Sequence, residues 1–224
     1  MNTEQKEAAL LALAHKRQNT RYEGHTCIGD YDKGIWECDH VSPFSLSAHN
    51  ANADVMIILQ DWCSSDSFDL PVCEETLKLG HTPSVKTNIY LKDLLKRHLG
   101  LTLADTYATN LFPFVKPGAM NAPIPAQDLL KAANEFTLPM IDIIQPKIAV
   151  CLGLETYNAI RKALGYTKLP NLAAAIAEPI EYQETRICCQ AHTGQLGRNN
   201  RNRDGVDRVN ADWETLALGL SPNI

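Results

Sequence analysis

The stretch Ala53-Asp54-Val55-Met56-Ile57-Ile58-Leu59-Gln60-Asp61-Trp62 decides the fold class of this chain. It is an unbroken apolar run that stops at an amide, a carboxylate and an indole. Such a run is typical of a strand buried on both faces, as in a parallel sheet covered by helices. Asp61 then lies at the carboxyl end of the strand, where open α/β sheets bind ligands. The pattern alone is equally compatible with an aspartate that begins a turn or caps a helix.

Composition places the chain among ordinary globular proteins. It has 224 residues, 45% hydrophobic and 21% charged, with a formal net charge of -5. This balance disfavours nonspecific coating of nucleic acid, which depends on many cationic contacts to phosphates. No segment has the apolar length of a membrane span, and the N-terminus lacks the apolar part of a secretory signal. We expect a cytoplasmic, monomeric protein with one domain over residues 1–224, made of a lead-in (1–52) and an α/β core (53–219).

Apolar runs alternate with helical spacing along the core. Besides the strand that ends at Leu59, strands are expected over 104–109, 147–152 and 186–190. Helices are expected over 3–18, 87–98, 126–145, 155–164 and about 210–218, with Pro139 dividing or kinking the third. This alternation predicts a three-layer αβα fold with a central four-stranded, mainly parallel sheet. The segment 60–86 is expected to be irregular, and loops of this length often form active sites.

Four residues lie one or two positions after the ends of the predicted strands: Asp61, Asn110, Gly153 and His192. Because the carboxyl ends of parallel strands meet at one edge, we expect a carboxylate, an amide and an imidazole to converge there. Each could also be structural: Asn110 as an Asx turn and His192 as a satisfied polar side chain. Together they indicate a hydrolase that acts on a nitrogenous ligand.

The seven cysteines form no regular framework. Cys27 and Cys38, with His25 and His40, could supply four zinc ligands, but the chain lacks the close C-x-x-C pair of typical zinc sites. We expect no metal here and interpret these cysteines as loop thiols.

The order of these motifs resembles the uracil-DNA glycosylase superfamily over about residues 53 to 210. In the best known branch the first motif reads G-Q-D-P-Y-H and the last H-P-S-P-L-S. Here the first reads Leu59-Gln60-Asp61-Trp62, and the last, residues 192–197, reads His-Thr-Gly-Gln-Leu-Gly. Trp62 replaces a proline, and both prolines of the last motif are missing, so the chain resembles a divergent branch.

The resemblance implies that the protein hydrolyses the N-glycosidic bond of a nucleotide flipped out of DNA, leaving an abasic site. Asp61 would orient or deprotonate water and stabilise the sugar cation, and His192 would donate a hydrogen bond to the departing base. Asn110 would read the base edge. Leu196 would enter the vacated stack as a wedge; the alternative is a leucine tucked under a loop.

Other residues complete the expected site. The resemblance places Gln60 and Trp62 beside the base, and we choose Phe68 as the stacking ring, with Trp62 and Phe112 as competitors. Arg198 and Arg201 follow the last motif and are expected to hold phosphates, unless they belong to a solvated loop. Some branches of the superfamily carry iron-sulfur clusters, but here the cysteine spacing predicts none, and we expect no cofactor.

Two functions remain open at this point. The chain is either a monofunctional DNA glycosylase involved in base excision or DNA repair, or a non-catalytic member that binds DNA or a protein partner. Within the enzyme interpretation, the base could be uracil, a deaminated purine or a bulky modified pyrimidine such as those of some phage genomes.

Overall fold

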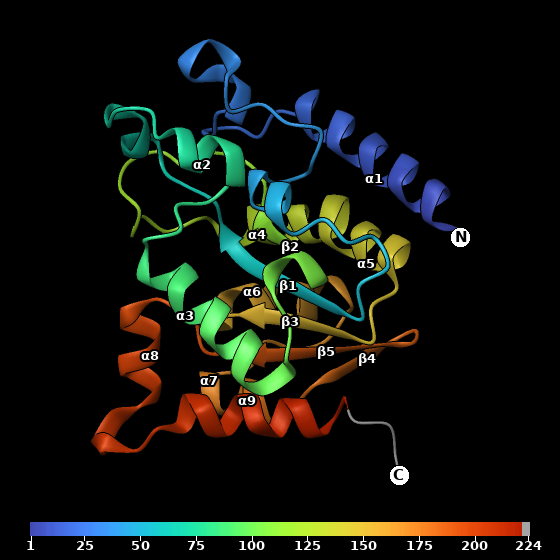
Figure 1. Cartoon of the computed structure of the whole chain (residues 1–224), viewed down its shortest axis with the longest axis vertical. Helices are drawn as coiled ribbons and strands as arrows, with labels where there is room; N and C mark the ends of the chain where they lie inside the picture. Colours follow the sequence, from blue (N-terminus) through green and yellow to red (C-terminus); the bar gives the residue numbers. More distant parts are fainter. Residues whose placement is uncertain (221–224) are drawn as a thin grey trace.

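The structure, a computed structural model, describes residues 1–220, so residues 221–224 of the predicted domain lie outside the described residues. Within this range five strands form one sheet in the order β2-β1-β3-β5-β4 (Figure 1). They are β1 (Val55–Asp61), β2 (Tyr107–Phe112), β3 (Ile148–Leu152), β4 (Ile180–Tyr182) and β5 (Thr185–Gln190). All neighbours pair in parallel except β4, which is antiparallel to β5. The predicted α/β class with a mainly parallel sheet is therefore confirmed.

Two details of the strand prediction are wrong. The prediction of four strands missed β4, a three-residue edge strand joined to β5 by a turn at which Gln183 adopts a φ of 52°. So short a strand has no apolar periodicity to reveal it. The second strand begins at Tyr107 rather than residue 104, because Leu103–Asp105 form a 3-10 turn. It ends at Phe112 rather than at residue 109, so Asn110 lies within β2 and not after it.

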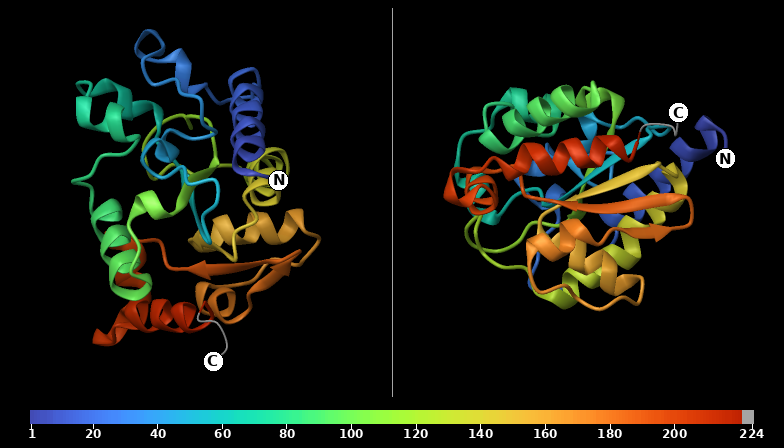
Figure 2. Two further views of the ribbon diagram at one scale, coloured as in Figure 1. Left: turned by 45° about the vertical axis from the view of Figure 1, so that its right-hand side comes forward. Right: turned by 90° about the horizontal axis from the view of Figure 1, so that it is seen from below.

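Helices cover both faces of the sheet, which makes three layers (Figure 2). The helices are α1 (Thr3–Gln18), α2 (Glu74–Leu79), α3 (Lys86–Leu94), α4 (Ala126–Ala132), α5 (Leu138–Ile144), α6 (Leu154–Ala163), α7 (Leu172–Ala177), α8 (Gln195–Arg201) and α9 (Arg208–Leu218). Met56 and Ile58 pack in the core beneath α1, α4, α5 and α6, whereas Val55, Ile57 and Leu59 pack beneath α3 and α9. Alternate side chains of β1 thus face opposite layers, as a strand buried on both faces requires.

The helix predictions are mostly confirmed. The segment 126–145 is divided as expected, with a π-helical turn at Ala133–Thr137 between α4 and α5, and Pro139 lies in the first turn of α5. The first helix is capped by Asn2, whose side chain accepts from Gln5 N at 2.9 Å, and Thr3 is its first residue. Helices α2, α7 and α8 were missed because each is only six or seven residues long.

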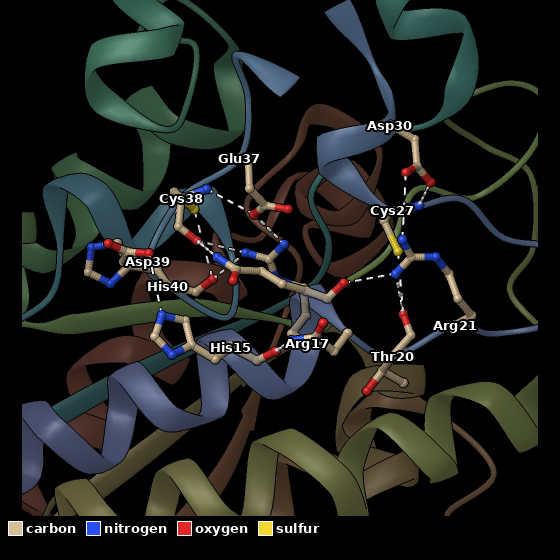
Figure 3. Close-up of polar contacts among 12 residues, drawn as sticks. His15, Arg17, Thr20, Arg21, Cys27, Asp30, Glu37, Cys38, Asp39 and His40 are labelled. Carbon is tan, nitrogen blue, oxygen red and sulfur yellow. Dashed lines mark hydrogen bonds and ion pairs between the residues drawn. The ribbon is translucent and has the colours of Figure 1, made fainter. Parts of the chain in front are cut away.

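The irregular lead-in is held against α1 by one buried side chain. Arg17 is fully buried and donates to the carbonyl oxygens of Cys38 and His40, both at 2.8 Å, and to the Glu37 carboxylate (Figure 3). These bonds connect the end of the helix to the backbone of the segment around residues 37–40.

None of the helices within residues 1–220 is long and apolar enough to cross a membrane.

Candidate active site

A pocket of about 440 Å³ opens at the carboxyl ends of β1 and β5. The arrowheads of β1, β3 and β5 point toward the side of the molecule on which α2, α3 and α8 lie (Figure 1). The walls come from the lead-in and from the 62–88 segment, and Asp61, Asn110 and His192 all line the pocket. The structure therefore brings together the three polar residues that the sequence placed after three different strands.

Asp61 is the last residue of β1 and is paired with a buried lysine. Lys116 Nζ lies 2.8 Å from Asp61 Oδ2, and the two side chains are only 3% and 10% exposed. Nζ also donates a hydrogen bond to Met120 O at 2.6 Å, which helps to hold the ammonium beside the carboxylate. Burial raises the pKa of Asp61, while Lys116 and, more weakly, His192 oppose that rise. Lys116 does not line the pocket and stands behind the carboxylate.

His192 is held in one tautomer. Its Nδ1 accepts the backbone N–H of Gly194 at 3.0 Å, so in the neutral ring the proton is on Nε2. Burial lowers the pKa of His192, and the opposing effect of Asp61 is smaller. A neutral imidazole that offers an N–H to the pocket is suited to stabilising negative charge as it develops.

Two glycines permit this arrangement. A Cβ at Gly197 would lie 2.3 Å from His192 O, and a Cβ at Gly194 would lie 2.9 Å from His192 Nδ1. Any side chain at either position would push the α8 segment away from the imidazole. The two glycines therefore allow the close packing that positions His192, although this chain lacks both prolines of the resembled motif.

Asn110 presents a free donor. Its Oδ1 accepts from Ser42 Oγ at 2.6 Å, and Ser42 Oγ in turn accepts from Phe44 N at 3.2 Å. Asn110 Nδ2 is buried and has no hydrogen-bond partner within the part of the chain that the structure describes. An unpaired buried donor costs about 1–3 kcal/mol, which a ligand carbonyl in the pocket would recover.

The predicted base-binding residues divide into two groups. Trp62 and Phe68 line the pocket, and Trp62 Nε1 donates to Gly80 O at 2.8 Å. The side chain of Gln60 is not part of the lining, because successive strand residues face opposite sides of a sheet and Asp61 takes the pocket side. Phe112, the competitor for base stacking, is fully buried in the core and also does not line the pocket.

Sequence reasoning missed several lining or supporting residues. Phe44 lines the pocket and stacks on His81 with ring centroids 5.0 Å apart. Cys63 lies two residues after Asp61, where the resembled motif has tyrosine, and it also lines the pocket. Lys116 was not recognised. No local pattern marks these residues, apart from the unusual occurrence of a lysine next to the apolar Phe114 and Val115.

The segment after His192 is a short helix and not the expected loop. Leu196 on α8 is 75% exposed, more than any other large apolar side chain described. Arg198 lies over the ring of Tyr90, with Cζ 3.6 Å from the centroid. Arg201 donates to both carboxylate oxygens of Asp212, at 2.6 and 2.8 Å, so its charge is paired within the protein.

Three of the four residues considered as zinc ligands have other side-chain partners. His25 Nε2 lies 3.2 Å from Asp128 Oδ2. Cys27 Sγ donates to Thr20 O, and Cys38 Sγ donates to His40 O (Figure 3). Throughout residues 1–220 no group of three or more His, Cys, Asp or Glu side chains is arranged to hold a metal ion.

Comparison with models of known protein families and with curated protein sequences finds no match to this chain.

Proposed function

We propose that this protein is a DNA glycosylase that hydrolyses the N-glycosidic bond of a base flipped into the pocket. The observation that carries the proposal is the arrangement of a buried carboxylate, an imidazole with a fixed Nε2–H and an unpaired amide donor around one pocket. These groups match the charges of the reaction, in which the sugar becomes positive and the departing base negative.

The charges in the pocket assign the roles. Asp61 accepts a proton from water and faces the sugar cation, and Lys116 beside it favours the ionised form that both tasks require. His192 Nε2–H donates to the base as negative charge develops on it. Asn110 Nδ2 donates to a carbonyl of the base, and the Ser42 hydroxyl fixes the amide in that orientation.

Lys116 is not placed to act as a covalent nucleophile. A lyase reaction requires the amine to reach the sugar, whereas Lys116 lies outside the pocket lining, behind Asp61. This position favours a monofunctional enzyme that leaves an intact abasic site.

The exposed Leu196 supports DNA as the partner. Its side chain is 75% exposed, so it is free to contact DNA, and it lies four residues after His192. In the complex it would fill the space that the extruded base leaves in the stack.

A second candidate is a protein that binds DNA or another macromolecule without catalysis. The net charge of -5 and the internal pairing of Arg201 with Asp212 reduce the attraction for phosphates, so within this candidate they favour a protein partner over DNA. The two candidates differ in one measurable property, the formation of abasic sites.

The test is a panel of single- and double-stranded oligonucleotides, each with one altered base, assayed for abasic sites in single turnover. On an oligonucleotide whose base the wild type releases, Asp61→Asn should fold and keep DNA affinity, with a lower melting temperature because the buried Lys116 loses its counter-charge. Excision should fall by several orders of magnitude, since an amide neither carries the charge nor accepts the proton. Near-normal excision by a folded Asp61→Asn variant would refute this mechanism. Binding without release of any base would favour the second candidate.

A further inference from the structure

The pocket extends beyond its polar end into a group of aromatic rings. Trp36, Trp62 and Phe68 all line it and are half-buried. Their ring centroids are 5.8 Å apart for the two tryptophans, 6.1 Å for Trp36 and Phe68, and 6.2 Å for Trp62 and Phe68. Because they approach edge-on or tilted rather than stacked face to face, the rings enclose the pocket from different directions. We call these three rings the aromatic wall.

A carboxylate stands at the same wall. Asp32 lines the pocket, and its Oδ2 accepts from Trp36 Nε1 at 2.6 Å, which fixes the carboxylate beside the indole. No ion pair of Asp32 occurs among the described residues, and no lysine or arginine of the described chain lines the pocket. The wall therefore combines electron-rich ring faces with an uncompensated negative charge.

This combination attracts a cation. Aromatic faces bind ammonium groups through their quadrupoles, and cages of several rings recognise alkylammonium ligands. A phosphate would be repelled by Asp32, and a neutral neighbouring base would gain nothing from it.

The pocket also has room for more than a bare pyrimidine. Its volume of about 440 Å³ falls within the roughly 300–1,000 Å³ of sites that enclose drug-sized molecules. Cys63, which lines the pocket, has a smaller side chain than the tyrosine that the resembled motif has at this place. Trp62, adjacent in sequence to Asp61, makes the polar end and the wall parts of one continuous lining.

We propose that the base taken by this pocket carries an extended substituent that ends in an amine, and that Asp32 with the aromatic wall binds the ammonium group. This inference rests on the proposed function, since it names the substrate class of the same pocket. Asn110 and His192 hold the ring of the base, while its substituent crosses Cys63 to reach Trp36 and Asp32.

The test compares oligonucleotides that contain uracil, 5-aminopropyluracil or its N-acetylated counterpart, which has similar length but no charge. For each, excision in single turnover and equilibrium binding to Asp61→Asn protein are measured. We expect the amine to be preferred over the acetamide by roughly three- to thirty-fold in binding. The preference should fall toward unity in Asp32→Asn and in Trp36→Leu.

Asp69→Asn is the matched control, because Asp69 is an exposed carboxylate next to Phe68 in the sequence and does not line the pocket. It should leave the preference unchanged. Asp32→Asn alters only an exposed side chain, so it tests the inference even if Trp36→Leu fails to fold.

The outcomes separate the two proposals. Release of uracil with no amine preference, or a preference that survives both substitutions, would overturn the amine inference and leave the glycosylase standing. A binding preference lost in Asp32→Asn without release of any base would support the ammonium site and refute the enzyme. Equal binding of amine and acetamide by the wild type refutes the inference whatever is released.

Discussion

Gly197→Ala should damage the candidate active site although it replaces none of the residues that line the pocket. The new Cβ would lie 2.3 Å from His192 O and 2.9 Å from His192 Cβ, whereas ordinary contacts begin near 3.4 Å. The α8 segment and His192 must therefore separate by roughly 1 Å, and a misplacement of that size costs on the order of 100-fold in rate. Single-turnover excision on the best substrate of the oligonucleotide panel measures this loss.

Asn200→Ala is the control for this change. Asn200 lies on the same helix and is exposed, so its replacement by alanine alters helix composition without a clash. We expect it to retain wild-type rates. If Gly197→Ala folds normally and excises at the wild-type rate, the position of His192 is not critical and its proposed role as a donor is wrong.

Three further changes test other contacts. Lys116→Met removes the cation that opposes the burial-induced rise in the pKa of Asp61, so the ionised carboxylate persists only at higher pH. In a pH–rate profile of excision, the fall in rate on the acid side should therefore move to higher pH. An unmoved profile would contradict the pairing of Lys116 with Asp61. Arg17→Ala should lower the free energy of unfolding by about 3–5 kcal/mol, because it breaks a buried hydrogen-bond network. Arg21 is exposed, so Arg21→Ala is the control and should lower the free energy of unfolding by roughly 0–1 kcal/mol; urea denaturation measures both. Arg198→Ala should weaken DNA binding and reduce the salt slope by about 1 without changing base preference, as expected for one lost phosphate contact; equal affinity at every salt concentration would leave this arginine without a role in binding.

Local pattern was sufficient for the scaffold of the site. The apolar run from Val55 to Leu59 forms most of β1, and the helix over residues 3–18 has the predicted bounds. Buried strands and amphipathic helices reveal themselves in sequence because burial on one or both faces fixes the period of apolar residues. Parallel strand order then brings Asp61, Asn110 and His192 to one pocket, although they are far apart in the chain.

The chemistry of those residues depends on partner residues that no periodic pattern in the sequence indicates. Lys116 pairs with Asp61, Ser42 fixes Asn110, and the backbone of Gly194 sets the tautomer of His192. Each partner comes from a loop or a turn, where neither spacing nor composition indicates what a side chain will meet. Tertiary structure likewise removed Gln60 from the pocket, since strand alternation allows only one of two neighbours to face it.

The charge of the segment after His192 shows the same division. The sequence determined that it is cationic, with arginines at 198, 201 and 203. Only the folded chain decided which of these charges are paired within the protein. Arg201 on α8 is paired with Asp212 on α9, whereas Arg198 lies over the ring of Tyr90. Residue type is encoded locally, whereas the distance between opposite charges, which governs their interaction, is set by the packing of the helices.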